Sequence, residues 1–175
     1  MKIGIDVSQL AYKGTGVANF LNDLVLNLSK VDDKNQYILF FSSFKSDFPL
    51  PISSLNHNFQ VKKFKFPPSL LNLLWNRLHI FPIEWLIGDV DFFITSDWTE
   101  PPTIKAKKAT ILYDLIVYRH PKETDKKIIE VQKRKLKWVK KESKIIFCIS
   151  ESTKKDAKEI LGIEEERLVV IYPGI

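Results

Sequence analysis

The sequence predicts an α/β fold: a Rossmann-like, doubly wound and mostly parallel sheet of about seven strands. Two observations support this class. Short apolar runs alternate along the chain with segments of helical periodicity, and some of the apolar runs are apolar on both faces. Strands of that kind are typical of a parallel sheet covered by helices on both sides. A length of 175 residues suits one domain, so we expect residues 1–175 to form a single unit.

The first half of the chain supplies three of the expected strands. Residues 2–7 are a short β-like run, and residues 17–28 carry apolar side chains at the spacing of an amphipathic helix. Residues 37–41 are the second strand. Residues 59–66 are the third strand, which we expect at an edge of the sheet because half of its side chains are polar. The intervening residues 42–58 are the least regular stretch and predict a long loop.

The second half continues the alternation. Strands are expected at residues 90–95, 109–113, 144–149 and 168–172. Helices are expected at residues 70–78, after Pro67 and Pro68, and at about residues 125–141. A further helix should run from Ser150, a favourable N-cap, to Gly162, which is suited to the C′ position.

Composition limits the location and the partners. The single cysteine, Cys148, lies in an apolar run and is expected to be a small buried hydrophobe, so a reducing cytoplasm fits. The N-terminus does not resemble a signal peptide, and no apolar run approaches the length of a membrane span. Lys and Arg outnumber Asp and Glu by 27 to 21, which indicates either an anionic partner or a lysine-rich solvated surface.

Ligands of doubly wound folds gather at the carboxyl ends of the strands, so the loops there hold the candidate residues. Gly14-Thr15-Gly16 follows the first strand; its glycines permit close approach of a ligand, and the helix N-terminus offers N–H groups to an anion. The alternative is a tight turn with no ligand. The motif is not a dinucleotide fingerprint, because Asn19 occupies the position of the third glycine.

Two further loops follow strands. In the first, Asp97 and Glu100 can bind sugar hydroxyls and Trp98 can stack on a sugar ring; the alternative is a solvated loop with a buried tryptophan. In the second, Tyr113 precedes Asp114, whose carboxylate can take a proton from an attacking hydroxyl. The alternative is an aspartate that caps the next turn. The three histidines and one cysteine are scattered, so no metal site is expected.

The helix at about 125–141 has a cationic face, formed by Lys133, Arg134, Lys137, Lys140 and Lys141. This face can rest on anionic lipid headgroups, bind nucleic acid, or simply face solvent. We do not expect nucleic acid, because no recognition motif accompanies the helix. A peripheral position on the inner face of the cell membrane stays open.

Several of these segments, in this order, carry a family resemblance. Residues 14–20 resemble a Gly-Thr-Gly-Ile-Gly-Arg-Tyr-like turn, and residues 110–115 resemble a strand ending in His-Asp-Leu, with Pro121 beyond it. Residues 146–156 resemble a run of valine-serine-glutamate-serine-threonine-lysine, and residues 161–163 and 169–174 resemble a closing run. Together they resemble the N-terminal domain of GT-B glycosyltransferases of the family 4 type, over nearly the whole chain.

The resemblance implies an acceptor-binding domain of a nucleotide-sugar-dependent glycosyltransferase. Transfer would proceed with retention of configuration, without a metal or cofactor, in polysaccharide or glycolipid synthesis. A C-terminal domain beyond Ile175 would hold the nucleotide-sugar, so we expect this chain to fold but not to transfer sugar. Tyr113 stands where many members have histidine and is a poor base near neutral pH, which makes Asp114 the better candidate base.

The expected site is therefore as follows. The catalytic candidates are Asp114 and Tyr113, and the donor- or acceptor-binding candidates are Gly14, Thr15, Gly16, Asn19, Asp97, Trp98, Glu100 and Ser150. The alternative function is a stand-alone Rossmann-like module that binds a nucleotide, a sugar or an anionic surface without catalysis.

Overall fold

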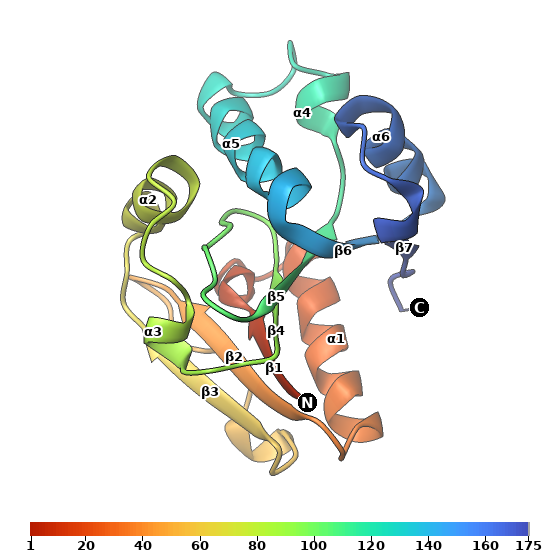
Figure 1. The fold of residues 1–175 in the computed structure, drawn as a ribbon. Coiled ribbons are helices and arrows are strands. Elements are labelled where there is room, and N and C mark those ends of the chain that lie inside the picture. The colour runs from red at the N-terminus through yellow and green to blue at the C-terminus, as the bar shows by residue number, and fades with distance from the viewer. Residues whose placement is uncertain (175) are drawn as a thin grey trace.

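A seven-stranded, wholly parallel sheet forms the centre of the molecule (Figure 1), in a computed structural model that describes residues 1–174. The strands are β1 (Lys2–Asp6), β2 (Gln36–Ser42), β3 (Phe59–Phe64), β4 (Phe92–Thr95), β5 (Lys107–Leu112), β6 (Ser143–Cys148) and β7 (Leu168–Val170). Their order across the sheet is β3-β2-β1-β4-β5-β6-β7. The predicted fold class is confirmed, and the half-polar β3 is an edge strand as expected.

Helices occupy most of the connections. The α-helices are α1 (Gly16–Val31), α2 (Pro68–Leu71), α3 (Glu84–Ile87), α4 (Ile116–Arg119), α5 (Lys126–Glu142) and α6 (Glu151–Leu161). Three 3₁₀ turns are η1 (Ser8–Ala11), η2 (Ile52–Ser54) and η4 (Glu165–Arg167). The helix expected at residues 70–78 is instead α2 followed by the π-helical segment η3 (Asn72–Arg77). The single-turn helices α3 and α4 were not predicted, because four residues are too few to show a helical period.

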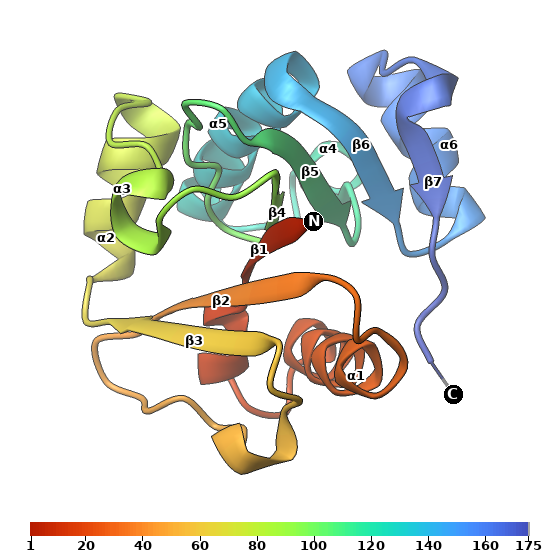
Figure 2. The ribbon, with the colours of Figure 1, turned by 60° about the horizontal axis from the view of Figure 1, so that its bottom comes forward.

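Helices and the loop between β2 and β3 cover the two faces of the sheet (Figure 2), and an apolar core lies beneath them on each face. On one face, α1 and the loop between β2 and β3 pack together, and this loop contributes Phe48 and Leu50 to the core. On the other face lie α2, α3, α5 and α6, in two clusters centred on Trp75 and on Leu136. Burying both faces explains why the central strands are apolar on both sides.

The ends of the long helices are capped as the sequence predicts. The Ser150 hydroxyl accepts a hydrogen bond from the Thr153 N–H (3.1 Å), and Gly162 ends α6 in the left-handed conformation. The Thr15 hydroxyl likewise caps α1 by accepting from the Ala18 N–H (3.2 Å). Cys148 is fully buried, as expected. Within residues 1–174, no helix combines the length and the apolar character needed to cross a bilayer.

The strand order places a crevice beside β1. The chain leaves β1 toward β2 on one side, and later returns from β3 to β4 on the other side of β1. The order of strands therefore reverses between β1 and β4. In doubly wound sheets, ligands bind at such a reversal, outside the carboxyl ends of the strands.

Candidate functional site

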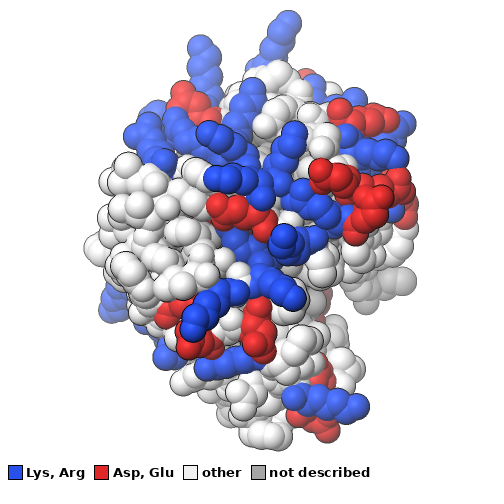
Figure 3. All heavy atoms as spheres, in the orientation of Figure 1, with Lys and Arg blue, Asp and Glu red and all other residues white. Residues whose placement is uncertain are grey.

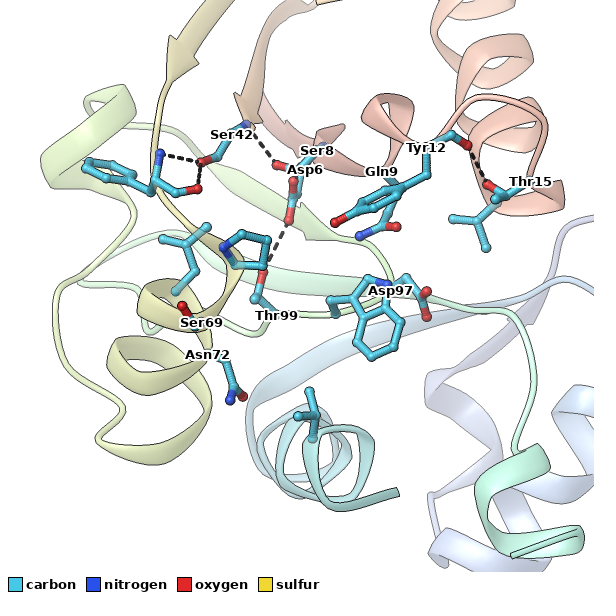
Figure 4. Close-up of a pocket in the computed structure, with 16 residues that line it drawn as sticks. Asp6, Ser8, Gln9, Tyr12, Thr15, Ser42, Ser69, Asn72, Asp97 and Thr99 are labelled. Carbon is cyan, nitrogen blue, oxygen red and sulfur yellow. Dashed lines mark hydrogen bonds between the residues drawn. The ribbon is translucent and has the colours of Figure 1, made fainter. Parts of the chain in front are cut away.

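A cavity of about 520 Å³ lies at the carboxyl ends of β1, β2 and β4, where the strand order reverses. Figure 4 shows that its polar side chains come from the last residues of β1 and β2, from the segment after β1, from α2 and η3, and from the loop after β4. Its lining is Asp6, Ser8, Gln9, Tyr12, Thr15, Val17, Ser42, Phe66, Pro68, Ser69, Leu71, Asn72, Asp97, Trp98, Thr99 and Val131.

The lining has a definite chemical character. It offers two carboxyl groups, from Asp6 and Asp97, together with several hydroxyls and the amides of Gln9 and Asn72. The aromatic rings of Tyr12 and Trp98 form part of the wall. None of its lining residues is Lys, Arg or His. The rest of the wall is apolar and includes Val17, Phe66, Leu71 and Val131. The polar groups can hydrogen-bond a neutral ligand rich in hydroxyl groups, and ionised carboxylates repel a phosphate.

Asp6 ends β1 and lies buried at the cavity. Its carboxylate accepts hydrogen bonds from the Ser8 N–H (2.9 Å) and from the Thr99 hydroxyl (3.4 Å; Figure 4). Burial raises the pKa of Asp6, and the bonds from Ser8 partly oppose this shift. The sequence analysis places candidate residues in the loop after Asp6 and does not include Asp6 itself. The signal that could have identified Asp6 is its position as the last residue of a buried strand.

Asp97 is held by the long helix α5. The Gln132 amide nitrogen donates to the Asp97 carboxylate and to its backbone carbonyl, both at 3.2 Å. The buried Lys135 ammonium donates to the Ser96 carbonyl. Burial raises the pKa of Asp97, while the positive charge of Lys135 opposes the shift. Burial also lowers the pKa of Lys135, and Glu100 is its strongest acidic neighbour.

The buried Asn76 of η3 fixes the other end of the same loop. Its amide nitrogen donates to the Trp98 carbonyl (2.9 Å), and its amide oxygen accepts from the Glu100 N–H (3.0 Å). Residues 96–100 are therefore bonded to both η3 and α5. A site whose groups are held by a second layer of hydrogen bonds needs little ordering when a ligand binds. Sequence reasoning did not identify Asn76, Gln132 or Lys135.

Glu100 corrects one expectation. Its side chain is wholly buried, accepts a hydrogen bond from the Thr95 hydroxyl (2.6 Å) and pairs with Lys108 (2.9 Å). Lys108 also pairs with Glu142 of α5 (3.0 Å). Glu100 does not line the larger cavity, and its carboxylate is instead paired with Lys108 in the interior.

A second cavity of about 270 Å³ adjoins the first and shares Asp97 and Trp98 with it. Tyr113 and Asp114 line this cavity. The Tyr113 hydroxyl lies 3.3 Å from the Ser96 hydroxyl, and burial raises the pKa of Tyr113, so the phenol stays neutral. The exposed Asp114 carboxylate accepts from the Ile116 N–H (3.0 Å), which is the capping role of our alternative reading.

The glycine turn is only partly at the site. Thr15 lines the larger cavity, whereas Gly14, Gly16 and Asn19 line neither. Gly14 has a φ of 83°, a conformation that explains a glycine without any ligand. Ser150 also lies outside both cavities, as the cap of α6.

No protein-family model and no curated protein sequence matches the chain. Among residues 1–174, no three His, Cys, Asp or Glu side chains are grouped as ligands of a metal ion would be. The fold and the larger cavity therefore carry the functional argument.

Proposed function

We propose that the chain is the acceptor-binding domain of a nucleotide-sugar-dependent glycosyltransferase, and that the larger cavity binds the saccharide acceptor. The observation that carries this proposal is the composition of that cavity: two carboxyl groups, hydroxyls, amides and three aromatic rings, with no cation among its lining residues. Carboxylates accept hydrogen bonds from sugar hydroxyls, and aromatic rings cover the apolar faces of sugars. The motif resemblance points to the same class of enzyme.

The geometry also favours Asp97 over Asp114 as the group that accepts the proton of the attacking hydroxyl. Asp97 lines both cavities, and burial raises its pKa toward the range useful for a base. Asp114 is exposed and already bonded to the backbone of the next turn. Tyr113 would contribute a hydrogen bond rather than basic chemistry.

The diphosphate of the donor would lie outside the larger cavity. The carboxylates of Asp6 and Asp97 in this cavity would repel the negatively charged diphosphate. No Lys, Arg or His lines the cavity to offset this repulsion. In the proposed enzyme, cations elsewhere stabilise the leaving phosphate. The purified chain is accordingly expected to bind saccharides and to leave them unmodified when nucleotide-sugars are added.

Binding to a panel of neutral oligosaccharides, followed by calorimetric titration of those retained, tests the proposal. Asp97→Asn removes a hydrogen bond to a charged group, worth about 1.5–3 kcal/mol, so the affinity should fall roughly 10- to 150-fold. Trp98→Leu should also weaken binding. Asp114→Asn is the matched control and should change the affinity less than about threefold.

Two results would oppose the proposal. One is binding of a nucleotide or inorganic phosphate in the larger cavity together with no saccharide binding. The other is a saccharide affinity that is unchanged in Asp97→Asn and Trp98→Leu alike.

A further inference from the structure

An exposed apolar edge lies beside the site, on the segment from η3 to α3. We define it as Leu73, Leu78, Ile80 and Trp85, residues that are 41%, 54%, 51% and 65% exposed. Single exposed apolar residues are ordinary, whereas a contiguous apolar patch marks an interaction surface. Figure 3 shows an uncharged surface over α2 and α3 that borders on the Lys and Arg side chains over α5.

The backbone around the apolar edge adopts two energetically unfavourable conformations. Among residues 1–174, His79 and Phe81 are the non-glycine residues with left-handed φ angles, 52° and 72°. Such conformations persist only where the surroundings fix them. Here His79 Nδ1 lies 2.8 Å from the Trp75 carbonyl oxygen, and Trp75 Nε1 donates to the Phe81 carbonyl (2.9 Å). Leu78 and Ile80 are therefore held outward by a rigid turn and not by a loose loop.

The turn is attached to the cationic face of α5. The Trp138 ring stacks on the His79 ring, with centroids 3.6 Å apart, and Trp138 Nε1 donates to the Asn76 carbonyl (2.9 Å). The ammonium groups of Lys137 and Lys141 lie 5.6 and 5.1 Å from the centroid of the same indole. Lysine charges thus stand next to the apolar edge.

Most of these charges have no acidic partner. Lys133, Lys137, Lys140 and Lys141 form no ion pair with any of residues 1–174, whereas Arg134 pairs with Glu130 at 2.7 Å. Unpaired lysines bordering exposed Leu, Ile and Trp are the pattern of a surface that meets acidic headgroups and the acyl boundary together.

We propose that the apolar edge and the lysines of α5 dock this chain on an anionic lipid bilayer. Leu78 and Ile80 enter the acyl boundary, Trp85 lies at headgroup level, and Lys137 and Lys141 contact lipid phosphates. The docking does not depend on the proposed transferase function. If that function holds, the membrane lies beside η3, whose first residue, Asn72, lines the acceptor cavity.

Co-sedimentation of the chain with vesicles tests the docking. Vesicles of phosphatidylcholine with a third of phosphatidylglycerol should bind the chain, and vesicles of phosphatidylcholine alone should bind it at least tenfold more weakly. Binding to the anionic vesicles should fall as salt rises. Lys137→Gln with Lys141→Gln should weaken it about 30-fold, at about 1 kcal/mol per lysine, and should flatten the salt dependence.

The apolar contribution is tested by Leu78→Gln with Ile80→Gln, which should weaken binding at least tenfold at every salt concentration. Val31→Gln with Ile52→Gln is the matched control, because both residues are exposed but lie on the α1 face of the sheet. Lys30→Gln with Lys34→Gln is the corresponding charge control. Circular dichroism should show that every variant is folded.

Three results would overturn the docking proposal. Equal binding to neutral and anionic vesicles would remove the role of the lysines. An equal loss of vesicle binding in the edge variants and in their control variants would show that binding does not depend on this particular surface. A concentration-dependent dimer that Leu78→Gln with Ile80→Gln dissolves, without vesicle binding by the wild type, would show that a second copy covers the edge.

Discussion

Replacement of Asn76 by alanine should both destabilise the fold and loosen the candidate site. Asn76 is 2% exposed, and its amide bonds the Trp98 carbonyl and the Glu100 N–H. Alanine would leave the buried Glu100 N–H and the partly buried Trp98 carbonyl without this partner, at up to about 1–3 kcal/mol each. The expected loss in unfolding free energy is therefore about 2–6 kcal/mol. A loss of about 4 kcal/mol lowers the melting temperature of a chain of this size by roughly 8–16 °C.

Urea unfolding followed by circular dichroism measures the loss. Asn22→Ala is the matched control. Asn22 lies on α1, and among residues 1–174 its side chain bonds only that of its neighbour Asp23 (3.1 Å). The free energy of unfolding of this variant should therefore stay within about 0.5 kcal/mol of the wild-type value. Amide exchange should accelerate at residues 96–100 of Asn76→Ala. A loss below about 1 kcal/mol, or unchanged exchange in that loop, would refute the claim that Asn76 fixes it.

Three other changes test separate parts of the structure. Gly4→Ala would place a Cβ atom 2.7 Å from a Phe93 ring carbon and should cost about 1–3 kcal/mol by urea unfolding; a neutral result would contradict the tight contact. The Asn35 side chain and the Tyr37 hydroxyl bond the Asp32 carboxylate and lower its pKa from the ordinary 3.8, so its contribution is present above pH 3.8 and lost as the pH falls below it. The stability gap between wild type and Asp32→Asn should narrow on acidification, and a constant gap from pH 7 to pH 3 would oppose this. Burial raises the pKa of Cys148 to about 11, so a thiol reagent at pH 8 should react only as fast as the chain unfolds; immediate reaction would contradict its burial.

The fold could be predicted because its signals are local. Strands that are apolar on both faces alternate with helical patterns, and Ser150 and Gly162 mark the ends of α6 directly. Besides the single-turn helices α3 and α4, one exception is η3, where the Leu78 N–H bonds the Leu73 carbonyl (3.0 Å) five residues back. The apolar spacing at residues 70–78 does not distinguish that π-helical register from an α-helix.

The site could be predicted only in part because its supports come from distant segments. Asp97 and Trp98 line the larger cavity, and the sequence could place them at this edge of the sheet because they follow a buried strand. Glu100 was misplaced because nothing in the sequence shows that Lys108 is buried beneath it. Lys135 could not be singled out either, since it stands among exposed lysines on α5 and only the packing of that helix buries it.

Chemical-shift mapping of the ¹⁵N-labelled chain tests the central claim most directly. A neutral oligosaccharide retained in the binding panel, UDP and inorganic phosphate would be titrated in turn. The account predicts that the saccharide shifts the signals of the Trp98 indole N–H and of the backbone amides of residues 97–99 and 6–9. UDP and inorganic phosphate should leave these signals unchanged. Shifts of these signals by UDP or phosphate, with none from the saccharide, would contradict an acceptor cavity.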